Sequence, residues 1–202
     1  LAIGQADRDD GIAQRPDAAR AVAEQDWQAL ASLFDPLWPA LKAQGIQQFH
    51  FHVPPATSLY RVHKPASHGD DLSTTRLAVV EVNRNHQPVG GLETGQGGTG
   101  IRGVVPVTFN GQPVGSVEFG RALDASLFAD LLGKDSRLAI YLFEQGKPVL
   151  LTGTAMLGES ADWYQGVLAG ESRFATIKQQ GSDFLVMAAP LRDFSGKAVG
   201  VI

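Results

Sequence analysis

The chain has no cysteine among its 202 residues. That absence excludes disulfides, thiolate zinc sites, cysteine nucleophiles and thioether-linked haem, but it fits an oxidising or a reducing compartment equally well. An excess of basic residues is also missing, because 17 Lys and Arg stand against 21 Asp and Glu and the formal net charge is −4. No block rich in Lys or Arg occurs, so the sequence predicts no nucleic-acid partner.

Long apolar runs and a leader peptide are missing as well. No apolar run approaches the roughly 18 residues that span a bilayer, and no secretory signal is recognisable. Leu1 begins within a helical pattern, and the last residues, GKAVGVI, stop within a strand pattern. We therefore interpret the sequence as a piece of a longer protein whose flanking segments could include membrane helices.

What is present is an ordinary globular composition, with 44% apolar and 19% charged residues. Residues 1–45 predict a helical segment. Apolar residues between Ala18 and Phe34 recur at the spacing of one helix face, which predicts a continuous helix over 17–34. Asp35-Pro36 predicts a break before a short second helix.

From residue 46 the apolar period changes to the alternation of strands. The segments QFHFHV and TSLYRVH alternate, and two further alternating runs, IRGVVPVTF and PVGSVEFG, flank Asn110-Gly111. Asn-Gly between two such runs is a strong signal for a tight β-hairpin. Between these strands we expect a helix over 72–83 that begins at a cap formed by Asp70 or Asp71. The glycine-rich stretch 90–100 is expected to be a flexible loop.

Residues 121–202 repeat much of this scheme. A helix is expected at 124–133, followed by a hairpin in RLAIYLFEQGKPVLLTG, a short helix in ADWYQGVLAG and two further strands. The closing hairpins of the two halves resemble each other, since VPV and VGSV flank Asn-Gly in the first and APL and VGV flank Ser-Gly in the second. Two copies predict a tandem pair of small modules. We place the boundary near Gly120.

At this point the chain resembles a known family. The segments FHVPPATSLYRVHKP, GDDLS, GLETGQGGTGIRGVVPV and GSVEFG are similar to those of double Cache domains. These are the extracytoplasmic sensor parts of bacterial chemoreceptors, sensor histidine kinases and diguanylate cyclases. The resemblance implies an α+β fold, with an N-terminal helical segment (1–45) and two PAS-like modules with antiparallel sheets. The membrane-distal module (46–120) would hold the ligand, and the membrane-proximal module (121–202) would act as a relay.

The strands of the first module each carry an apolar face and a polar face, because side chains alternate along a strand. Several strands place Arg, His or Glu on the polar face, which could be a solvated surface or the wall of a pocket. We favour a pocket closed by the loops 64–72 and 90–100, with Arg61 and Arg102 binding a carboxylate through their planar donors. The candidate ligand-binding residues are His52, Arg61, His63, Asp71, Arg76, Glu93, Arg102 and Glu118.

Other functions remain open at this stage. His50, His52 and His63 could hold a metal ion or a b-type haem, or the domain could be a scaffold that dimerises without a ligand. No motif of a catalytic nucleophile or of paired carboxylates stands out, so we predict neither an enzyme nor a resident cofactor. The expected protein is periplasmic, attached to the membrane through flanking segments, and able to form a homodimer through its N-terminal helix.

Overall fold

The computed structural model describes residues 11–95, 98–124, 137–144, 147–153, 161–179 and 181–202. The chain divides into two compact units, Leu1–Ala122 and Leu123–Ile202. N-terminal helices precede antiparallel sheets, and both units combine helices with such sheets, which confirms the predicted α+β class.

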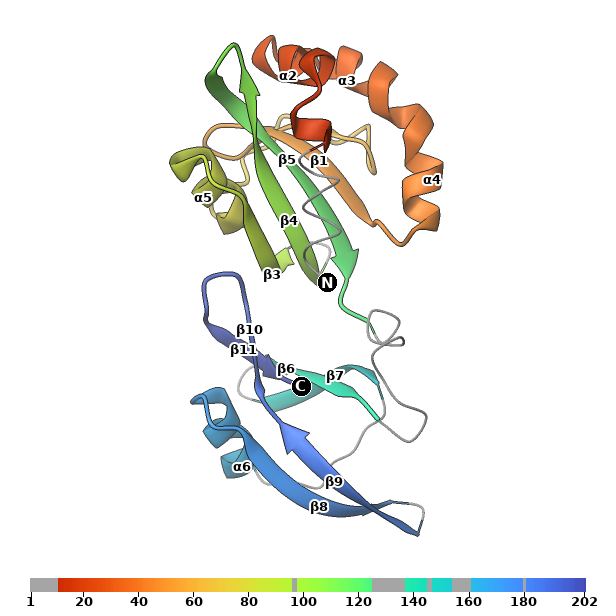
Figure 1. Ribbon diagram of the computed structural model, residues 1–202, viewed down its shortest axis with the longest axis vertical. Coiled ribbons are helices and arrows are strands. Elements are labelled where there is room, and N and C mark those ends of the chain that lie inside the picture. The colour runs from red at the N-terminus through yellow and green to blue at the C-terminus, as the bar shows by residue number, and fades with distance from the viewer. Residues whose placement is uncertain (1–10, 96–97, 125–136, 145–146, 154–160, 180) are drawn as a thin grey trace. The chain divides into compact units, whose positions relative to one another are not determined.

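The first unit is built on a five-stranded antiparallel sheet with the strand order β2-β1-β5-β4-β3 (Figure 1). Its strands are β1 (Gln48–Val53), β2 (Thr57–Arg61), β3 (Val89–Gly95), β4 (Gly98–Phe109) and β5 (Gln112–Ala122). The predicted hairpin is confirmed at the turn between β4 and β5. Asn110 and Gly111 have φ angles of 50° and 76°, the left-handed conformations that a type I′ turn requires.

Helices cover both faces of this sheet (Figure 1). They are α2 (Pro16–Ala23), α3 (Trp27–Phe34), the 3-10 turn η1 (Asp35–Leu37), α4 (Trp38–Ala43) and α5 (Leu77–Asn85). The prediction of one continuous helix over 17–34 is wrong, because two separate helices, α2 and α3, occupy this range. The chain leaves the helix at Gln25, with φ 54°, and the Asp26 side chain accepts a hydrogen bond from the Ala29 N–H at 2.9 Å to start α3.

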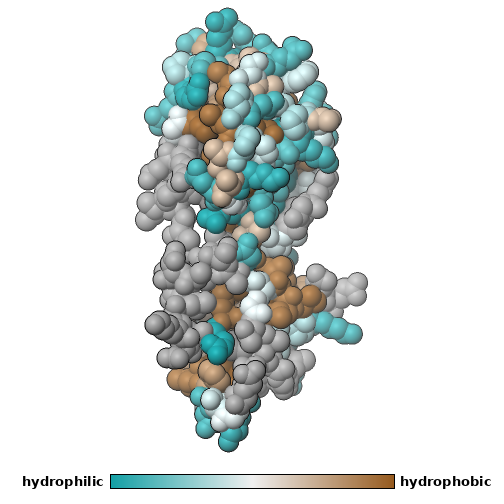
Figure 2. Space-filling model, turned by 90° about the vertical axis from the view of Figure 1, so that its right-hand side faces the viewer, coloured by the Kyte–Doolittle hydropathy of each residue, from teal (hydrophilic) through white to brown (hydrophobic). Residues whose placement is uncertain are grey.

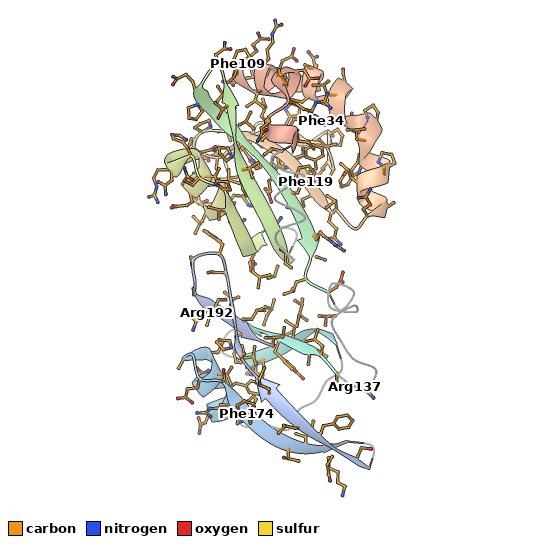
Figure 3. All side chains as sticks on the ribbon, viewed as in Figure 1. Phe34, Phe109, Phe119, Arg137, Phe174 and Arg192 are labelled. Atoms are coloured by element: carbon orange, nitrogen blue, oxygen red, sulfur yellow. The ribbon has the colours of Figure 1, made fainter. Side chains whose placement is uncertain are left out.

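The hydrophobic core of the unit lies between the sheet and the N-terminal helices. Phe49 and Phe51 of β1 are fully buried, and their ring centroids each lie 5.1 Å from that of Phe34 on α3. Phe119 of β5, labelled in Figure 3, stacks on Phe49 with the two ring centroids 4.3 Å apart. Burying each of these rings contributes about 1.5–3 kcal/mol. The aromatic side of each strand therefore faces α2 and α3, and the polar side faces away from them.

The helix predicted over 72–83 begins five residues later, at Leu77, and neither aspartate caps it. Arg76 is the N-cap residue, and its side chain forms no cap hydrogen bond. Glu93 of β3 supplies the cap instead, because its Oε1 accepts the Ala78 N–H at 2.9 Å. Asp71 accepts from the Ser73 N–H at 2.9 Å and so stabilises a turn before the helix.

The glycine-rich stretch 90–100 is not a flexible loop in its described part. Residues 90–95 belong to β3 and 98–100 to β4, and they pair in register from Val89↔Val104 to Gly95↔Gly98. Glycine lowers local strand propensity, but pairing with a long neighbouring strand overrides that preference. Glu93 is consequently fixed on a sheet instead of lying on a mobile rim.

The second unit contains a four-stranded sheet in the order β10-β11-β6-β7 and a separate β8-β9 hairpin. Its elements are β6 (Ala139–Glu144), β7 (Lys147–Gly153), α6 (Ala161–Leu168), β8 (Arg173–Gln179), β9 (Ser182–Ala188), β10 (Pro190–Arg192) and β11 (Ala198–Val201). The predicted hairpin and the helix at 161–168 are confirmed, but four strands follow that helix where two were predicted. The helix expected at 124–133 falls almost wholly outside the described residues.

Apolar side chains lie at the surface of the second unit, where brown patches are visible in Figure 2. Phe174 is 63% exposed, Leu185 77% and Met187 63%, all on the β8-β9 hairpin. Among the described residues, no helix is both long enough and apolar enough to cross a membrane.

Candidate functional site

Polar side chains gather on the sheet face opposite the phenylalanines of the first unit. The alternation of β1, β4 and β5 turns them toward this side, and residues from β2, β3 and the start of α5 join them. Each is at most 8% exposed. They are His50, His52, Arg61, Arg76, Glu93, Arg102 and Glu118. Charged groups are rarely buried to this extent unless they are paired, so their partners define the site.

Glu118 lies at the centre of this group and is completely buried. Its Oε1 accepts hydrogen bonds from Arg76 Nη2 and, at 3.1 Å, from Arg102 Nη1. Burial raises the pKa of Glu118, but its neighbours, Arg76 first among them, outweigh that effect and leave the pKa below its usual value. Glu118 is therefore an ionised carboxylate held by two guanidinium groups.

Glu93 and Gln48 complete the pairing of the two arginines. Glu93 Oε2 lies 3.0 Å from Arg76 Nε and 3.8 Å from Arg102 Nε. Burial, opposed by Arg76, raises the pKa of Glu93. The Gln48 Oε1 accepts from Arg102 Nη1 and, at 3.4 Å, from Arg76 Nη1. Gln48 was not among the predicted residues, although it lies two positions before His50 and shares its face of the strand.

The two buried histidines of β1 lie side by side, with ring centroids 3.8 Å apart. His50 Nε2 and the Ser58 Oγ form a hydrogen bond of 2.8 Å. Burial lowers the pKa of His52 to about 3, although Glu118 opposes the shift, and burial also places the pKa of His50 well below 6.5. Both imidazoles are consequently neutral near pH 7, which lets two rings share a buried site.

Arg61, which the sequence singled out as a carboxylate ligand, already binds a carboxylate of the protein. Its Nη1 and Nη2 donate to the two oxygens of Asp70 at 2.6 and 2.8 Å, and Nη1 also donates to the Ser67 carbonyl at 2.7 Å. The hydrogen bonds from Arg61 hold the pKa of Asp70 below its usual value. This fork ties the segment that follows β2 to the strand itself.

His63 lies just beyond β2 and contacts the backbone of β1. Its Nδ1 is 3.2 Å from the Phe49 N and 3.0 Å from the Phe49 O. Burial lowers the pKa of His63, and the hydrogen bond to Phe49 partly opposes that shift. The Nε2, for which no hydrogen bond to a described residue occurs, is the side of the ring that remains for a ligand.

A cavity of about 410 Å³ opens beside this network. It is lined by Gln47, Gln48, His50, Arg61, His63, Lys64, Ser67, Leu72, Thr75 and Arg76. Three of the predicted site residues, Arg61, His63 and Arg76, therefore meet at one hollow. The segment 64–75 forms one wall, as expected for 64–72, but none of the described residues of 90–100 lines the cavity.

The other predicted residues do not line this cavity. His52, Glu93 and Glu118 belong to the buried network, and Asp71 is exposed at the turn before α5. Arg102 instead lines a separate cavity of about 30 Å³ with Gln48. Lys64 also lines the cavity but was not among the predicted site residues. It lies on the loop between β2 and α5, where no alternation of apolar and polar residues indicates which side chains face the site.

The second unit has a cavity of different character, about 250 Å³ in volume. Its walls are mainly apolar and include Tyr141, Trp163 and Val186. Tyr164, next to Trp163, is buried with Val167 of α6 in a small apolar cluster. No cluster of buried charges comparable to that of the first unit occurs among the described residues of this unit.

Comparisons with known proteins agree with this architecture. Residues 10–202 match the model of the dCache_3 family, described as a double sensory domain of two-component sensor kinases. No curated protein sequence matches the chain.

Solved structures with similar folds include the extracellular domain of the putative histidine kinase vpHK1S-Z8, with 11% identity and a TM-score of 0.55 over 95% of this chain and 82% of that one. The sensor domain of the V. cholerae histidine kinase DctB has 9% identity and a TM-score of 0.55, over 96% and 85% of the two chains. A domain of a putative sensory box/GGDEF protein from Vibrio parahaemolyticus has 12% identity and a TM-score of 0.54, over 94% and 83%. At these identities the likeness shows the fold.

Proposed function

The chain belongs to the dCache_3 family of double sensory domains, and on that basis we propose that its first unit binds a small water-soluble ligand that carries a carboxylate group. The observation that carries the proposal is the charge of the 410 Å³ cavity. Every charged side chain that lines it is basic: Arg61, Lys64 and Arg76. Polar groups from Gln47, Ser67 and Thr75 supply further hydrogen-bonding sites around them.

The strength of this preference depends on which cations are already neutralised. Arg76 is paired with Glu93 and Glu118, and Arg61 with Asp70. Lys64 forms no ion pair with any described residue, so its ammonium group is the cation that can meet an incoming anion without losing a partner. Removing the solvent from an unpaired charge is costly unless an opposite charge replaces it, which favours an anionic occupant over a neutral one.

The volume supports a small molecule as the ligand. Pockets for small molecules and cofactors span about 300–1,000 Å³, and this cavity lies near the lower end. Its lining residues on β1, β2 and the turn that leads into α5 are held in place before a ligand arrives, whereas Lys64 and Ser67 lie on the segment after β2. Preorganisation of this kind lowers the entropic cost of binding.

Binding of a ligand in the cavity would affect the N-terminal helices through the contacts that the cavity wall makes with them. The segment after β2 touches α3 where the tilted rings of His68 and Trp27 pack with their centroids 4.8 Å apart. The Tyr60 hydroxyl of β2 also donates to Asp35 at 2.6 Å. A ligand that favours one arrangement of this segment would thereby favour one position of α3. We propose that this shift passes through flanking membrane segments of a periplasmic receptor, with a homodimer formed through the N-terminal helices.

The proposal is tested by a thermal-shift screen of the purified chain followed by calorimetry. The compounds are mono- and dicarboxylates, amino acids, and amines and neutral alcohols of matched size. We expect stabilisation by carboxylates, which at 100 times the dissociation constant amounts to about 2.7 kcal/mol. Lys64→Gln should weaken binding of the best carboxylate about 5- to 10-fold, because the side chain is exposed and one hydrogen bond contributes about 1–1.4 kcal/mol there. Lys147→Gln, an exposed charge of the second unit, serves as the matched control.

Two results would overturn the proposal. Amines or neutral compounds could bind while carboxylates do not, or Lys64→Gln and Arg61→Lys could both leave carboxylate affinity unchanged. A screen without any stabilising compound, combined with a stable dimer in solution, would instead favour the ligand-free scaffold.

A further inference from the structure

Three potential metal ligands meet at the centre of the first sheet. His50 of β1 and Glu118 of β5 are directly paired across the two strands, and His52 lies two residues further along β1 on the same face. One ligand atom from each of the three lies within 4.8 Å of the others, and none of the three side chains is more than 3% exposed. Three donors this close together can reach a single ion with small side-chain rotations.

The unsatisfied hydrogen-bonding atoms of the network point to the same position. Among the described residues, neither nitrogen of His52 has a hydrogen-bond partner, and the same holds for Oε2 of Glu118. Buried polar atoms without a partner are rare in native proteins, and an ion at the site is one of the few physical explanations. The His52 Nε2 and the Glu118 Oε2 are 3.7 Å apart. Donors at about 2.0–2.2 Å from a tetrahedral Zn²⁺ are separated by roughly 3.3–3.6 Å, which is close to this distance.

The surrounding contacts orient the donors in the manner of a metal site. The two oxygens of Glu118 have separate partners, because Arg76 and Arg102 bind Oε1 and leave Oε2 toward His52. Ser58 fixes the ring of His50 through the hydrogen bond to Nε2. Hydrogen bonds from neighbouring groups to the ligands are a regular feature of metal sites and raise their affinity by 10- to 100-fold.

The charge of the neighbourhood permits a cation. Each of the three nearby arginines is within salt-bridge distance of an acidic group, so the network as a whole is neutral before an ion binds. The six groups are Arg61, Arg76, Arg102, Asp70, Glu93 and Glu118. His50 also lines the 410 Å³ cavity, which gives an ion a route from solvent.

We propose that His50, His52 and Glu118 form a site for a divalent transition-metal ion with two imidazole ligands and one carboxylate. Imidazole nitrogen suits zinc, copper, iron and nickel, and a set of two histidines and one glutamate with an open position is a known zinc arrangement. The site differs from the three-histidine set suggested by the sequence. His63 is outside the group of converging donors, and Glu118 takes the third place. The inference does not depend on the proposed carboxylate ligand, because it concerns the protein alone.

Zinc itself is the probe. The purified chain is treated with EDTA, freed of chelator and titrated with ZnCl₂ in competition with a zinc-binding dye, without any organic ligand. We expect one Zn²⁺ per chain with a dissociation constant below about 1 μM. His52→Gln and Glu118→Gln, which keep the side-chain size, should each weaken zinc binding at least 10-fold. His68→Gln and His86→Asn are the matched controls, because both residues are exposed histidines, and they should bind zinc as the parent chain does.

A second measurement needs no variant and guards against loss of folding. In the ¹⁵N-histidine-labelled parent chain, zinc should shift the ring nitrogens of His50 and His52 and leave those of His68 and His86 unchanged. The proposal is overturned if zinc shifts only the exposed histidines, if no zinc binds, or if folded His52→Gln and Glu118→Gln bind zinc as tightly as the parent. Because no carboxylate is present in this titration, its outcome is independent of the ligand screen.

Discussion

Replacing Glu118 by glutamine should destabilise the first unit more than any single exposed substitution. The carboxylate is fully buried, and its Oε1 accepts hydrogen bonds from both Arg76 and Arg102. Glutamine keeps the volume but not the charge. Glu93 is then the remaining acidic partner for two buried guanidinium groups. Removing one partner of a buried ion pair costs about 3–5 kcal/mol, and we expect about 4 kcal/mol here.

The measurement is urea unfolding followed by tryptophan fluorescence. Three tryptophans are present in the chain, and a Trp163→Phe background leaves Trp27 and Trp38, both in the first unit. With a slope of about 2 kcal/mol per M urea, a loss of about 4 kcal/mol lowers the midpoint by about 2 M.

The control for this substitution is Glu24→Gln, which removes an exposed ion pair with Arg20 and should leave the midpoint unchanged within error. A loss below about 1 kcal/mol for Glu118→Gln, with an unaltered slope, would show that the buried pairs are not needed for stability. An Arg102→Met/Glu118→Gln double variant should lose less than the sum of the two single losses, because it also removes the uncompensated cation.

Three further perturbations follow from single contacts. In EDTA, burial lowers the folded-state pKa of His52 to about 3 against 6.5 in the unfolded chain, so the unfolded state binds the extra proton and stability falls as pH drops below 6.5. His52 should contribute about 2 kcal/mol of this loss at pH 5, so the loss should be smaller by that amount in His52→Gln, and the lowered pKa values of His50 and His63 account for a further part. Tyr60→Phe removes the 2.6 Å hydrogen bond to Asp35 and should cost about 1.5 kcal/mol in urea unfolding. Gly115→Ala would place a Cβ 2.2 Å from the His52 carbonyl oxygen and should lower the thermal midpoint. Gly11→Ala should not, because among the described residues its Cβ would meet no atom within 4 Å outside its own helix and chain neighbours.

The strand elements and the polar face of the first sheet could be predicted because both depend on local alternation. The signal in Asn110-Gly111 is a property of two adjacent residues, and the turn forms as predicted. The same alternation turned His50, Arg102 and Glu118 to one side of the sheet. Their burial, however, depends on α5 and the segment before it, whose position no spacing in the sequence reveals.

The elements that were predicted wrongly depend on contacts between distant residues. The start of α5 is set by Glu93, fifteen residues away on β3, and a cap of that kind leaves no local pattern. The glycine-rich strand forms because β4 offers it a partner. The break at Gln25 did have a local signal, since Asp26 stands three residues before Ala29 in a capping position, but a continuous apolar face masked it.

Arg61 shows how a paired site could still respond to a ligand. Its guanidinium already satisfies Asp70, so a ligand carboxylate at Arg61 would exchange one charged partner for another and gain little from that contact alone. The Asp70 carboxylate would then lose this partner, while the backbone of its segment stays hydrogen-bonded to Ser58 of β2, so the change would reach the contact of His68 with Trp27 as a local rearrangement. Binding energy from Lys64 would in this way be converted into a change at α3, because a ligand shifts an equilibrium only through contacts that differ between the two states.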